Sequence, residues 1–146
     1  MGTKRTADYV VTGGGAMGMA FTDTLINESD ASVIIVDKHH RPGGHWNDAY
    51  PFVRLHQPSA FYGVNSKKMG NDAIDQVGWN AGLFELASGA EVCAYFDQVM
   101  QRQFLPSGRV EYFPCANPSV RARSGRWYPE RSLKSRPSAQ PWTRRT

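Results

Sequence analysis

The chain has 146 residues, of which 40% are hydrophobic and 21% are charged, and its formal net charge is +4 at pH 7. This length holds one domain with a core of its own, and two full domains would be cramped. No apolar run approaches the roughly 20 residues that cross a bilayer, so no membrane partner is expected. Two cysteines exclude a disulfide framework, and we expect a cytoplasmic protein.

The charge is divided unevenly along the chain. Residues 1–113 carry 9 Lys and Arg against 12 Asp and Glu, whereas residues 114–146 carry 8 against 1. The basic character therefore belongs to the second segment, the basic tail, and says little about what the first segment binds. We predict one folded domain over residues 1–113, followed by the basic tail over residues 114–146.

A short apolar strand at residues 8–11 runs into a glycine-rich turn and then into a helix. The turn has the spacing Gly13-x-Gly15-x-x-Gly18. In this pattern the first glycine permits the tight turn, the second lets the backbone approach a pyrophosphate, and the third lets the helix pack closely against the sheet. The helix N-terminus offers unpaired N–H groups and the positive end of its dipole to phosphates. We expect the cofactor to contact Gly13, Gly15, Ala16, Met17 and Gly18.

The elements on either side of the turn support this interpretation. Met17, Phe21 and Leu25 recur at helical spacing and predict the apolar face of the helix. A second strand at residues 32–36 ends on Asp37, which lies 24 residues beyond the first glycine, where an acidic side chain bonds a ribose hydroxyl. This is the layout of a dinucleotide-binding βαβ unit. The alternative is a βαβ unit that binds no nucleotide.

A second glycine segment, Gly43-Gly44-x-Trp46, follows six residues after the acidic end of the second strand. The glycine pair can bring the backbone close to a cofactor a second time, and Trp46 adds a flat apolar surface beside it. Both features suit a large, bent cofactor such as FAD better than a nicotinamide dinucleotide alone.

At these residues the chain resembles the FAD-binding half of two-dinucleotide-domain flavoproteins, nearest in pattern to the flavin-containing and Baeyer–Villiger monooxygenases. The glycine fingerprint, the acidic strand end and Gly43-Gly44-x-Trp46 followed by Tyr50-Pro51 carry the resemblance, which covers about residues 8–113. It implies an α/β, Rossmann-like FAD/NAD(P)-binding domain with a parallel sheet, present here in part. The FAD contacts that it implies are Gly13, Gly15, Gly18, Asp37, Lys38, Gly43, Gly44 and Trp46.

The resemblance also implies an activity. In this family NADPH reduces the flavin, and the flavin then oxygenates a small-molecule substrate with oxygen. The resemblance identifies neither the substrate nor any catalytic residue in this chain. No second glycine fingerprint for NADPH is present, because Gly78, Gly82 and Gly89 are too scattered to form one.

Two positions depart from the family pattern. The family usually has Glu where this chain has Asp37, and commonly Thr or Ser where it has His45. Because Asp is also frequent in NAD sites, a small NAD(P)-binding module without catalysis stays an alternative. A further alternative is an interaction protein that acts through its basic tail.

All four histidines fall in the loop region after the second strand: His39, His40, His45 and His56. Imidazole is a common metal ligand. No helical HxxxH pair and no neighbouring cysteine supports a metal site, however, so we expect polar loop residues and no bound metal.

The segment from residue 57 to residue 84 has no strong periodicity, because proline and glycine break it into short pieces. Its aromatic side chains could line a pocket or pack against the sheet, and we expect packing, which is the commoner fate of such residues. These side chains are Phe61, Tyr62, Trp79 and Phe84.

A second helix and a third strand follow. Ser88 and Glu91 have the spacing of a capping box, in which the Ser hydroxyl bonds forward and the Glu carboxylate bonds back. Residues 109–113 read as a strand, and a helix between strands favours a parallel sheet. We expect Cys93, beside the apolar face of the helix, to be a buried structural thiol. The predicted apolar face consists of Val92, Tyr95, Phe96, Val99 and Met100.

The basic tail is Arg-, Pro- and Ser-rich with almost no aliphatic residues, so we expect it to be disordered. It is interpreted as a flexible appendage, as a basic arm for nucleic acid, or as an out-of-frame reading of GC-rich DNA that truncates a longer family member. Trp127, Tyr128 and Trp142 could stack on bases, but few aromatics in such a tail indicate little, and we expect no nucleic-acid partner. Truncation is the favoured interpretation, and the gene tests it: the next reading frame should resume a flavoprotein pattern.

Overall fold

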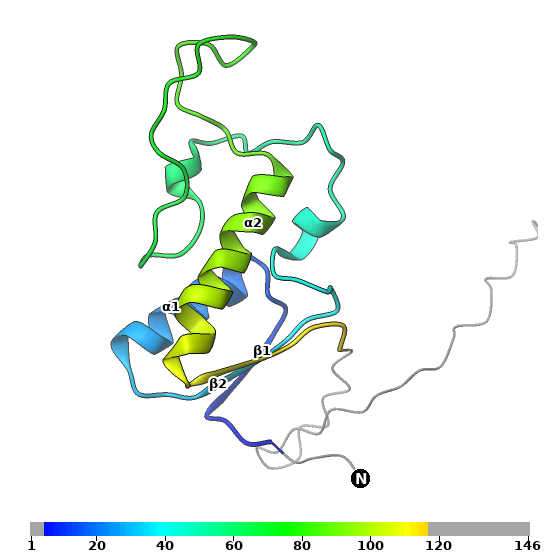
Figure 1. Ribbon diagram of the computed structural model, residues 1–146, viewed down its shortest axis with the longest axis vertical. Coiled ribbons are helices and arrows are strands. Elements are labelled where there is room, and N and C mark those ends of the chain that lie inside the picture. Colours follow the sequence, from blue (N-terminus) through cyan, green and yellow to red (C-terminus); the bar gives the residue numbers. More distant parts are fainter. Residues whose placement is uncertain (1–4, 117–146) are drawn as a thin grey trace, which may run out of the picture.

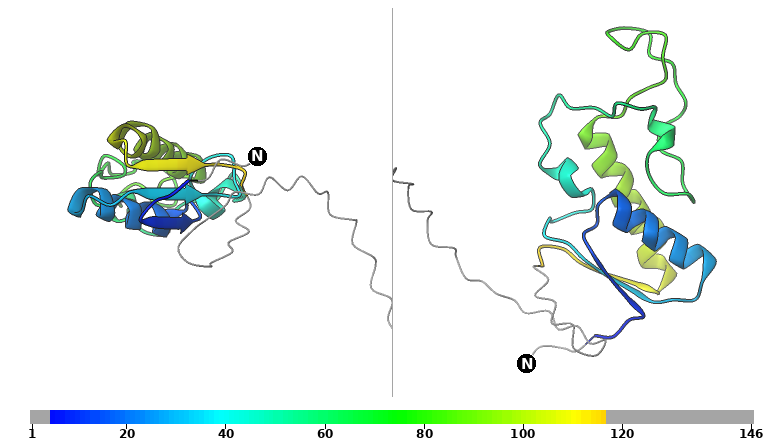
Figure 2. Two further views of the ribbon diagram at one scale, coloured as in Figure 1. Left: turned by 90° about the horizontal axis from the view of Figure 1, so that it is seen from below. Right: turned by 180° about the vertical axis from the view of Figure 1, so that it is seen from behind.

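Three parallel strands form the sheet, in the order β1-β2-β3 (Figure 1). The computed structural model describes residues 5–116. The strands are β1 (Tyr9–Thr12), β2 (Val33–Val36) and β3 (Val110–Phe113), and Figure 2 shows them stacked in this order, from blue through cyan to yellow. The α/β class and the parallel sheet that the sequence predicts are confirmed.

Each connection between strands carries a helix. Helix α1 (Ala16–Glu28) joins β1 to β2, and α2 (Gly89–Val99) lies in the long connection from β2 to β3. The chain continues from α2 through a π-helical turn, η3 (Met100–Phe104), and a 3-10 turn, η4 (Leu105–Ser107). The helical region ends at Gly108, whose left-handed conformation (φ 71°) suits glycine.

The core lies between the sheet and the two helices. Alternate residues of β2 point to opposite faces. Val33 and Ile35 face the helices, where they share one buried cluster with Met19 of α1 and Phe96 of α2. On the other face a smaller cluster holds Ile34 and Val36, with partly buried Ala7, Phe113 and Ala116 packed against it. Both helices therefore cover the same face of the sheet.

The apolar face predicted for α1 differs from the buried one. Met17 is 84% exposed and Phe21 is 48% exposed, whereas Met19, Thr22 and Asp23 are buried. The periodicity located the helix correctly, and Leu25 is partly buried against the core as predicted, but Met17 and Phe21 are not part of the buried side. The reason is that the core cluster receives the side of α1 that carries Met19, whereas Met17 is exposed and Phe21 packs at the rim, on the ring of Tyr9.

Helix α2 matches its prediction closely. The Ser88 hydroxyl accepts a hydrogen bond from the Glu91 N–H at 3.3 Å, and the Glu91 carboxylate accepts one from the Ser88 N–H at 2.7 Å, which completes the capping box. The Ser88 hydroxyl also donates to the Glu91 carboxylate at 2.7 Å, and this hydrogen bond, followed by that from the Ser88 N–H, lowers the pKa of Glu91. All five residues of the predicted apolar face, from Val92 to Met100, are buried.

Replacing the cap tests its contribution to stability. We expect Ser88→Ala to lower the free energy of unfolding by about 1 kcal/mol, because the N–H groups of the first turn lose their acceptor. Urea unfolding followed by circular dichroism measures the change, with Thr6→Ala, at an exposed site ahead of β1, as the control. Equal stability of the two variants would show that the capping box contributes nothing.

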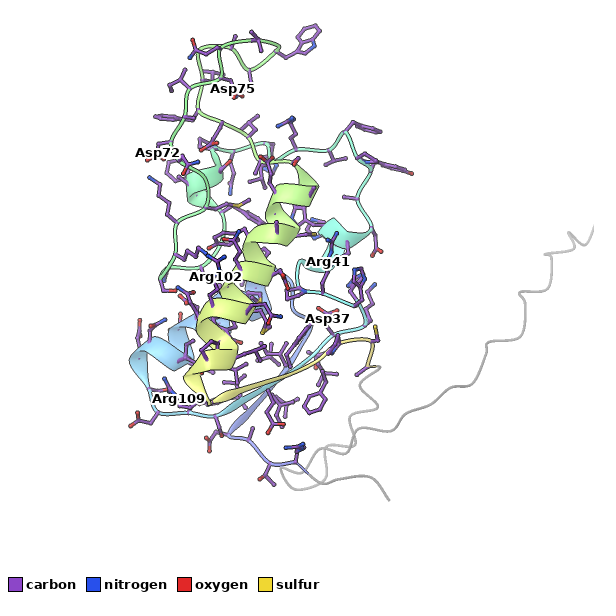
Figure 3. All side chains as sticks on the ribbon, in the orientation of Figure 1. Asp37, Arg41, Asp72, Asp75, Arg102 and Arg109 are labelled. Atoms are coloured by element: carbon purple, nitrogen blue, oxygen red, sulfur yellow. The ribbon has the colours of Figure 1, made fainter. Side chains whose placement is uncertain are left out.

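An arginine ties the start of β3 to the end of α1. The Arg109 guanidinium donates hydrogen bonds to the carbonyl oxygens of Ile26 and Ser29, both at 2.5 Å. A cation at this position satisfies the free carbonyls of a helix C-terminus and complements its dipole. Figure 3 shows Arg109 and Asp37 at opposite ends of the sheet, so this contact lies away from the carboxyl ends of the strands.

Between β2 and α2 the chain extends away from the sheet, as Figure 1 shows for its green segment. It includes a 3-10 turn, η2 (Ser59–Phe61), and a hairpin-like loop in which Ile74 pairs with Phe84. Tyr62 packs against the core as predicted. The packing prediction is wrong for Phe61, Trp79 and Phe84, which are 78%, 108% and 49% exposed, because the segment between β2 and α2 extends away from the sheet.

Residues 114–116 continue along the end of β2. The Cys115 N–H donates to the His39 carbonyl at 3.0 Å, and the Ala116 N–H donates to the Asp37 carbonyl at 2.9 Å. The remainder of the predicted basic tail, residues 117–146, lies outside the described residues. Across residues 5–116, none of the helices combines the length and the apolar character that crossing a membrane requires.

Candidate dinucleotide-binding site

The glycine-rich turn stands at the carboxyl end of β1. Gly13 adopts a positive φ of 97°, and its N–H donates to the Val36 carbonyl at 2.7 Å, which holds the turn beside the end of β2. In parallel α/β sheets, ligands bind in the crevice outside the carboxyl ends of the strands. The turn therefore occupies the position at which such a sheet receives a ligand.

Helix α1 begins without a cap. Its N-cap residue is Gly15, no side chain accepts a hydrogen bond there, and the first turn contains no acidic residue. The N–H groups of this turn have no intrahelical acceptor. Helix α2, by contrast, has both the hydroxyl and the carboxylate of a capping box. An anion placed at the start of α1 would accept hydrogen bonds from these N–H groups and interact favourably with the helix dipole.

Two glycines of the turn are required by close packing. A Cβ atom on Gly18 would lie 2.1 Å from the Gly13 carbonyl oxygen, so α1 approaches the turn as closely as only a glycine allows. A Cβ atom on Gly14 would lie 2.8 Å from Oδ2 of Asp37. The turn, the first turn of α1 and the end of β2 therefore form one tightly packed unit.

Asp37 holds this unit together. It directly follows β2 and is only 2% exposed (Figure 3). Its Oδ2 accepts a hydrogen bond from the Gly14 N–H at 2.6 Å, and its Oδ1 accepts one from the His39 N–H at 2.8 Å. Spacing alone predicts an acidic residue at the end of β2, but not that it also bonds the glycine turn.

The His39 ring lies between two carboxylates. Its Nδ1 is 3.2 Å from Oδ1 of Asp37, and its Nε2 is 2.8 Å from Oδ2 of Asp48. The hydrogen bond with His39 lowers the pKa of Asp48. Within the described part of the chain, no three His, Cys, Asp or Glu side chains are grouped to hold a metal ion. His39 thus fixes the loop that follows β2.

The second glycine segment meets the first. The Gly43 N–H donates to the Gly14 carbonyl at 2.9 Å. A Cβ atom on Gly44, which has a φ of 55°, would lie 2.8 Å from Cα of Gly15. The fold thus brings the two glycine segments together over the start of α1, while Lys38, between them in sequence, is exposed.

Trp46 anchors this loop to the core. It belongs to a 3-10 turn, η1 (Gly44–Asn47), and its indole Nε1–H donates to the Tyr62 hydroxyl at 2.8 Å. Its ring also lies against the start of α2, with Cε3 3.3 Å from the position of a Cβ on Gly89. Nearby Cys93 is buried, as expected, and burial raises the pKa of its thiol.

Sequence reasoning missed Tyr112. This residue lies in β3 opposite Ile35, and its Cε2 is 3.7 Å from the position of a Cβ on Gly14. Its hydroxyl is buried and has no hydrogen-bond partner among residues 5–116. Burial, and then the charge of Asp37, raise the pKa of this hydroxyl. The available signal was the position of Tyr112 in the predicted third strand, one residue before its carboxyl end, where the residues of a parallel sheet border a ligand site.

These features fit a dinucleotide better than a plain loop. The start of α1 presents unpaired N–H groups, two glycine segments leave its backbone free of side chains, and a buried hydroxyl beside Asp37 has no partner within the described residues. An unsatisfied buried polar group costs about 1–3 kcal/mol, so it calls for a partner such as a ligand or water.

The comparisons with known proteins agree with this geometry. Residues 11–65, from β1 through the second glycine segment, match the model of the NAD(P)-binding Rossmann-like domain family. The fold and this match together identify a Rossmann-like domain.

A solved structure shows which kind of enzyme this domain resembles. A flavin-containing monooxygenase from Stenotrophomonas maltophilia aligns over 73% of this chain and 28% of its own, with a TM-score of 0.52 and 26% identity. The predicted likeness to part of a flavin-dependent monooxygenase is therefore confirmed.

The curated relatives are much longer than the matched region. Uncharacterized proteins of Mycobacterium tuberculosis and Mycobacterium bovis are 68% identical to this chain over 107 residues, which are 73% of this chain. The chain spans about one fifth of their length, since the match covers 20% of each.

Proposed function

We propose that this chain is the FAD-binding part of an oxidoreductase, most like a flavin-dependent monooxygenase that uses NADPH. The observation that carries the proposal is the meeting of the two glycine segments over the uncapped start of α1, beside Asp37. The family match supports a dinucleotide, and the likeness to a flavin-containing monooxygenase favours FAD among the dinucleotides.

In this proposal the backbone binds the diphosphate. The N–H groups at Ala16 and Met17 in the first turn of α1 donate to its oxygens, and Gly13, Gly15 and Gly18 keep the approach free of side chains. Gly43 and Gly44 hold the second loop against the same turn. Trp46 and Lys38 border this loop. The flavin, when bound, supplies the redox chemistry, and the chain supplies binding and orientation.

Asp37 has two roles in the proposed site. A carboxylate has about four lone-pair sites. The N–H groups of Gly14 and His39 occupy two of them, and the His39 ring lies against a third, with Nδ1 3.2 Å from Oδ1. We assign the fourth to a ribose hydroxyl of the cofactor. Because Asp37 is only 2% exposed, this contact requires a local opening beside the carboxylate.

The proposal predicts a ligand-induced gain in stability. At FAD concentrations about 100 times the Kd, the free energy of unfolding should rise by about 2.7 kcal/mol, because FAD binds only the folded form. Met17→Glu should weaken binding about tenfold or more by placing a carboxylate beside the diphosphate, whereas the matched Met17→Gln should not. Met17 is 84% exposed, so neither change should disturb the fold. Thermal unfolding with and without FAD measures both effects.

A non-catalytic NAD(P)-binding module is the second candidate. It is favoured by Asp37, which stands where the flavoprotein pattern has Glu, and by the family model, which is named for NAD(P). The same titration with NADP+ and NAD+ separates the two functions. A yellow protein that releases FAD on denaturation supports the flavoprotein, and stabilisation by a nicotinamide dinucleotide alone supports the module. Stabilisation by neither ligand would refute both.

A further inference from the structure

The hydroxyl of Tyr112 is buried without a partner in the described fold. Its side chain comes from β3, in register with Ile35 of β2, and packs against the core between the sheet and the helices. No hydrogen-bond partner for the hydroxyl lies among residues 5–116. The buried hydroxyl of Tyr95, by contrast, accepts from the Val64 N–H at 2.9 Å and donates to the Lys67 carbonyl. Because an unmade hydrogen bond at a buried group is costly, Tyr112 calls for a partner that the fold itself does not supply.

The Tyr112 ring lies beside Asp37 and the glycine turn. The pairing of β2 with β3 continues to Asp37, whose N–H donates to the Phe113 carbonyl at 3.0 Å. Since Asp37 follows Ile35 by two residues, its side chain leaves the same face of the sheet as that of Tyr112. Cε2 of Tyr112 is 3.7 Å from the position of a Cβ on Gly14, whose N–H donates to Asp37. Burial, and then the charge of Asp37, raise the pKa of Tyr112, so its hydroxyl stays protonated and able to donate.

A carboxylate and a phenol offer complementary hydrogen bonds to an alcohol. An ionised carboxylate only accepts, so an alcohol bonded to Asp37 donates its single proton there. The oxygen of that alcohol keeps lone pairs, and one of them can accept from the O–H of Tyr112. The two side chains together therefore suit a sugar hydroxyl, which is a donor and an acceptor at once.

We propose that Tyr112 binds the adenosine ribose of the dinucleotide, by donating a hydrogen bond to the sugar hydroxyl that donates to Asp37. This inference rests on the proposed function, which assigns a ribose to Asp37. It adds a residue from β3 that belongs neither to the glycine fingerprint nor to the acidic end of β2. A buried water molecule is the competing partner of the Tyr112 hydroxyl, and the stability of the ligand-free chain distinguishes the two.

Tyr112→Phe removes the hydroxyl and keeps the ring. We expect the ligand-free chain to lose no thermal stability, because the hydroxyl bonds nothing there, and the Kd for FAD to rise about fivefold to tenfold. Thermal unfolding of the full chain and titration with FAD measure the two effects.

Tyr95→Phe is the matched control, because it removes a buried hydroxyl that has two partners. It should lower the midpoint of thermal unfolding by about 4 °C or more and leave the Kd for FAD unchanged. If Tyr112→Phe lowered the midpoint of the ligand-free chain as much as Tyr95→Phe does, the hydroxyl would have a structural partner such as water, and the proposal would be overturned.

A pair of nucleotides locates the contact on the ligand. ADP and 2′,3′-dideoxy-ADP share the adenine and the diphosphate, but only ADP has ribose hydroxyls. Tyr112→Phe should bind ADP several-fold more weakly than the unmodified chain does, and should bind dideoxy-ADP equally well. If both nucleotides were weakened to the same extent, the ribose assignment would be wrong.

The outcomes separate this inference from the proposed function, because ADP is a part of both FAD and NAD+. A chain that binds ADP and NAD+ but not FAD refutes the flavoprotein, whereas a loss of ADP affinity in Tyr112→Phe still supports the ribose contact. FAD bound with unchanged affinity by Tyr112→Phe refutes the contact and leaves the flavoprotein standing. A chain that binds none of these nucleotides refutes both.

Discussion

Gly18→Ala should destabilise the chain by about 2 kcal/mol or more, although alanine forms helix better than glycine. Helix propensity alone favours the substitution by up to about 1 kcal/mol. The new Cβ, however, would lie 2.1 Å from the Gly13 carbonyl oxygen and 3.0 Å from a methyl of Val11. The first of these is a backbone atom held by the turn, so α1 has to move away from the sheet. Overpacking of this kind costs about 1–3 kcal/mol and at times more.

A second glycine of the same turn is the control. Gly15 has an extended backbone, and a Cβ there would lie 3.4 Å from Cα of Gly44, an ordinary contact. Gly15→Ala should therefore change stability by less than about 1 kcal/mol. Denaturant unfolding of both variants gives the comparison. If Gly18→Ala proved as stable as Gly15→Ala, the close approach of α1 to the turn would be wrong.

The parts of the fold that the sequence predicts are those specified by local chemistry. Ser88 and Glu91 cap α2 through hydrogen bonds within one turn, and the glycine spacing by itself marks the turn after β1, where Gly13 adopts a positive φ. The buried face of α1 is not local. Met17 and Phe21 have the right spacing and hydrophobicity, but which side of α1 is buried depends on how the helix packs against residues far away in the sequence. Trp79 was misjudged because the segment that carries it extends away from the sheet.

The candidate site also has parts that the sequence predicts and parts that depend on how distant segments meet. The position of Asp37 follows from strand length and the 24-residue spacing. Its hydrogen bonds to Gly14 and His39 depend on how the turn and the loop after β2 meet in space. Tyr112 comes from a strand 75 residues further along the chain, and only the register of β3 against β2 brings it beside Gly14.

Asp37→Asn should disrupt both the turn and the binding of dinucleotide. An amide has one acceptor oxygen and one donor NH2, but both backbone partners of Asp37, the N–H groups of Gly14 and His39, are donors. One of them would face the NH2 group in a buried environment. An unsatisfied buried donor costs about 1–3 kcal/mol, so we expect that loss in the free energy of unfolding. The proposed ribose contact is weakened as well, so the Kd for FAD should rise about tenfold, the equivalent of about 1.4 kcal/mol.

Asp48→Asn is the matched control, because both aspartates contact the His39 ring but only Asp37 contacts the glycine turn. The Asp48 side chain is 65% exposed, and its amide would still offer an acceptor to Nε2. Its effect on stability should stay within about 0.5 kcal/mol, as for other surface substitutions. Chemical unfolding and FAD titration of the two variants separate the roles. If Asp37→Asn and Asp48→Asn lost the same stability and the same FAD affinity, the effect would be due to their shared contact with His39. If Asp37→Asn bound FAD with unchanged affinity, Asp37 would not contact the ribose, although its structural role would stand.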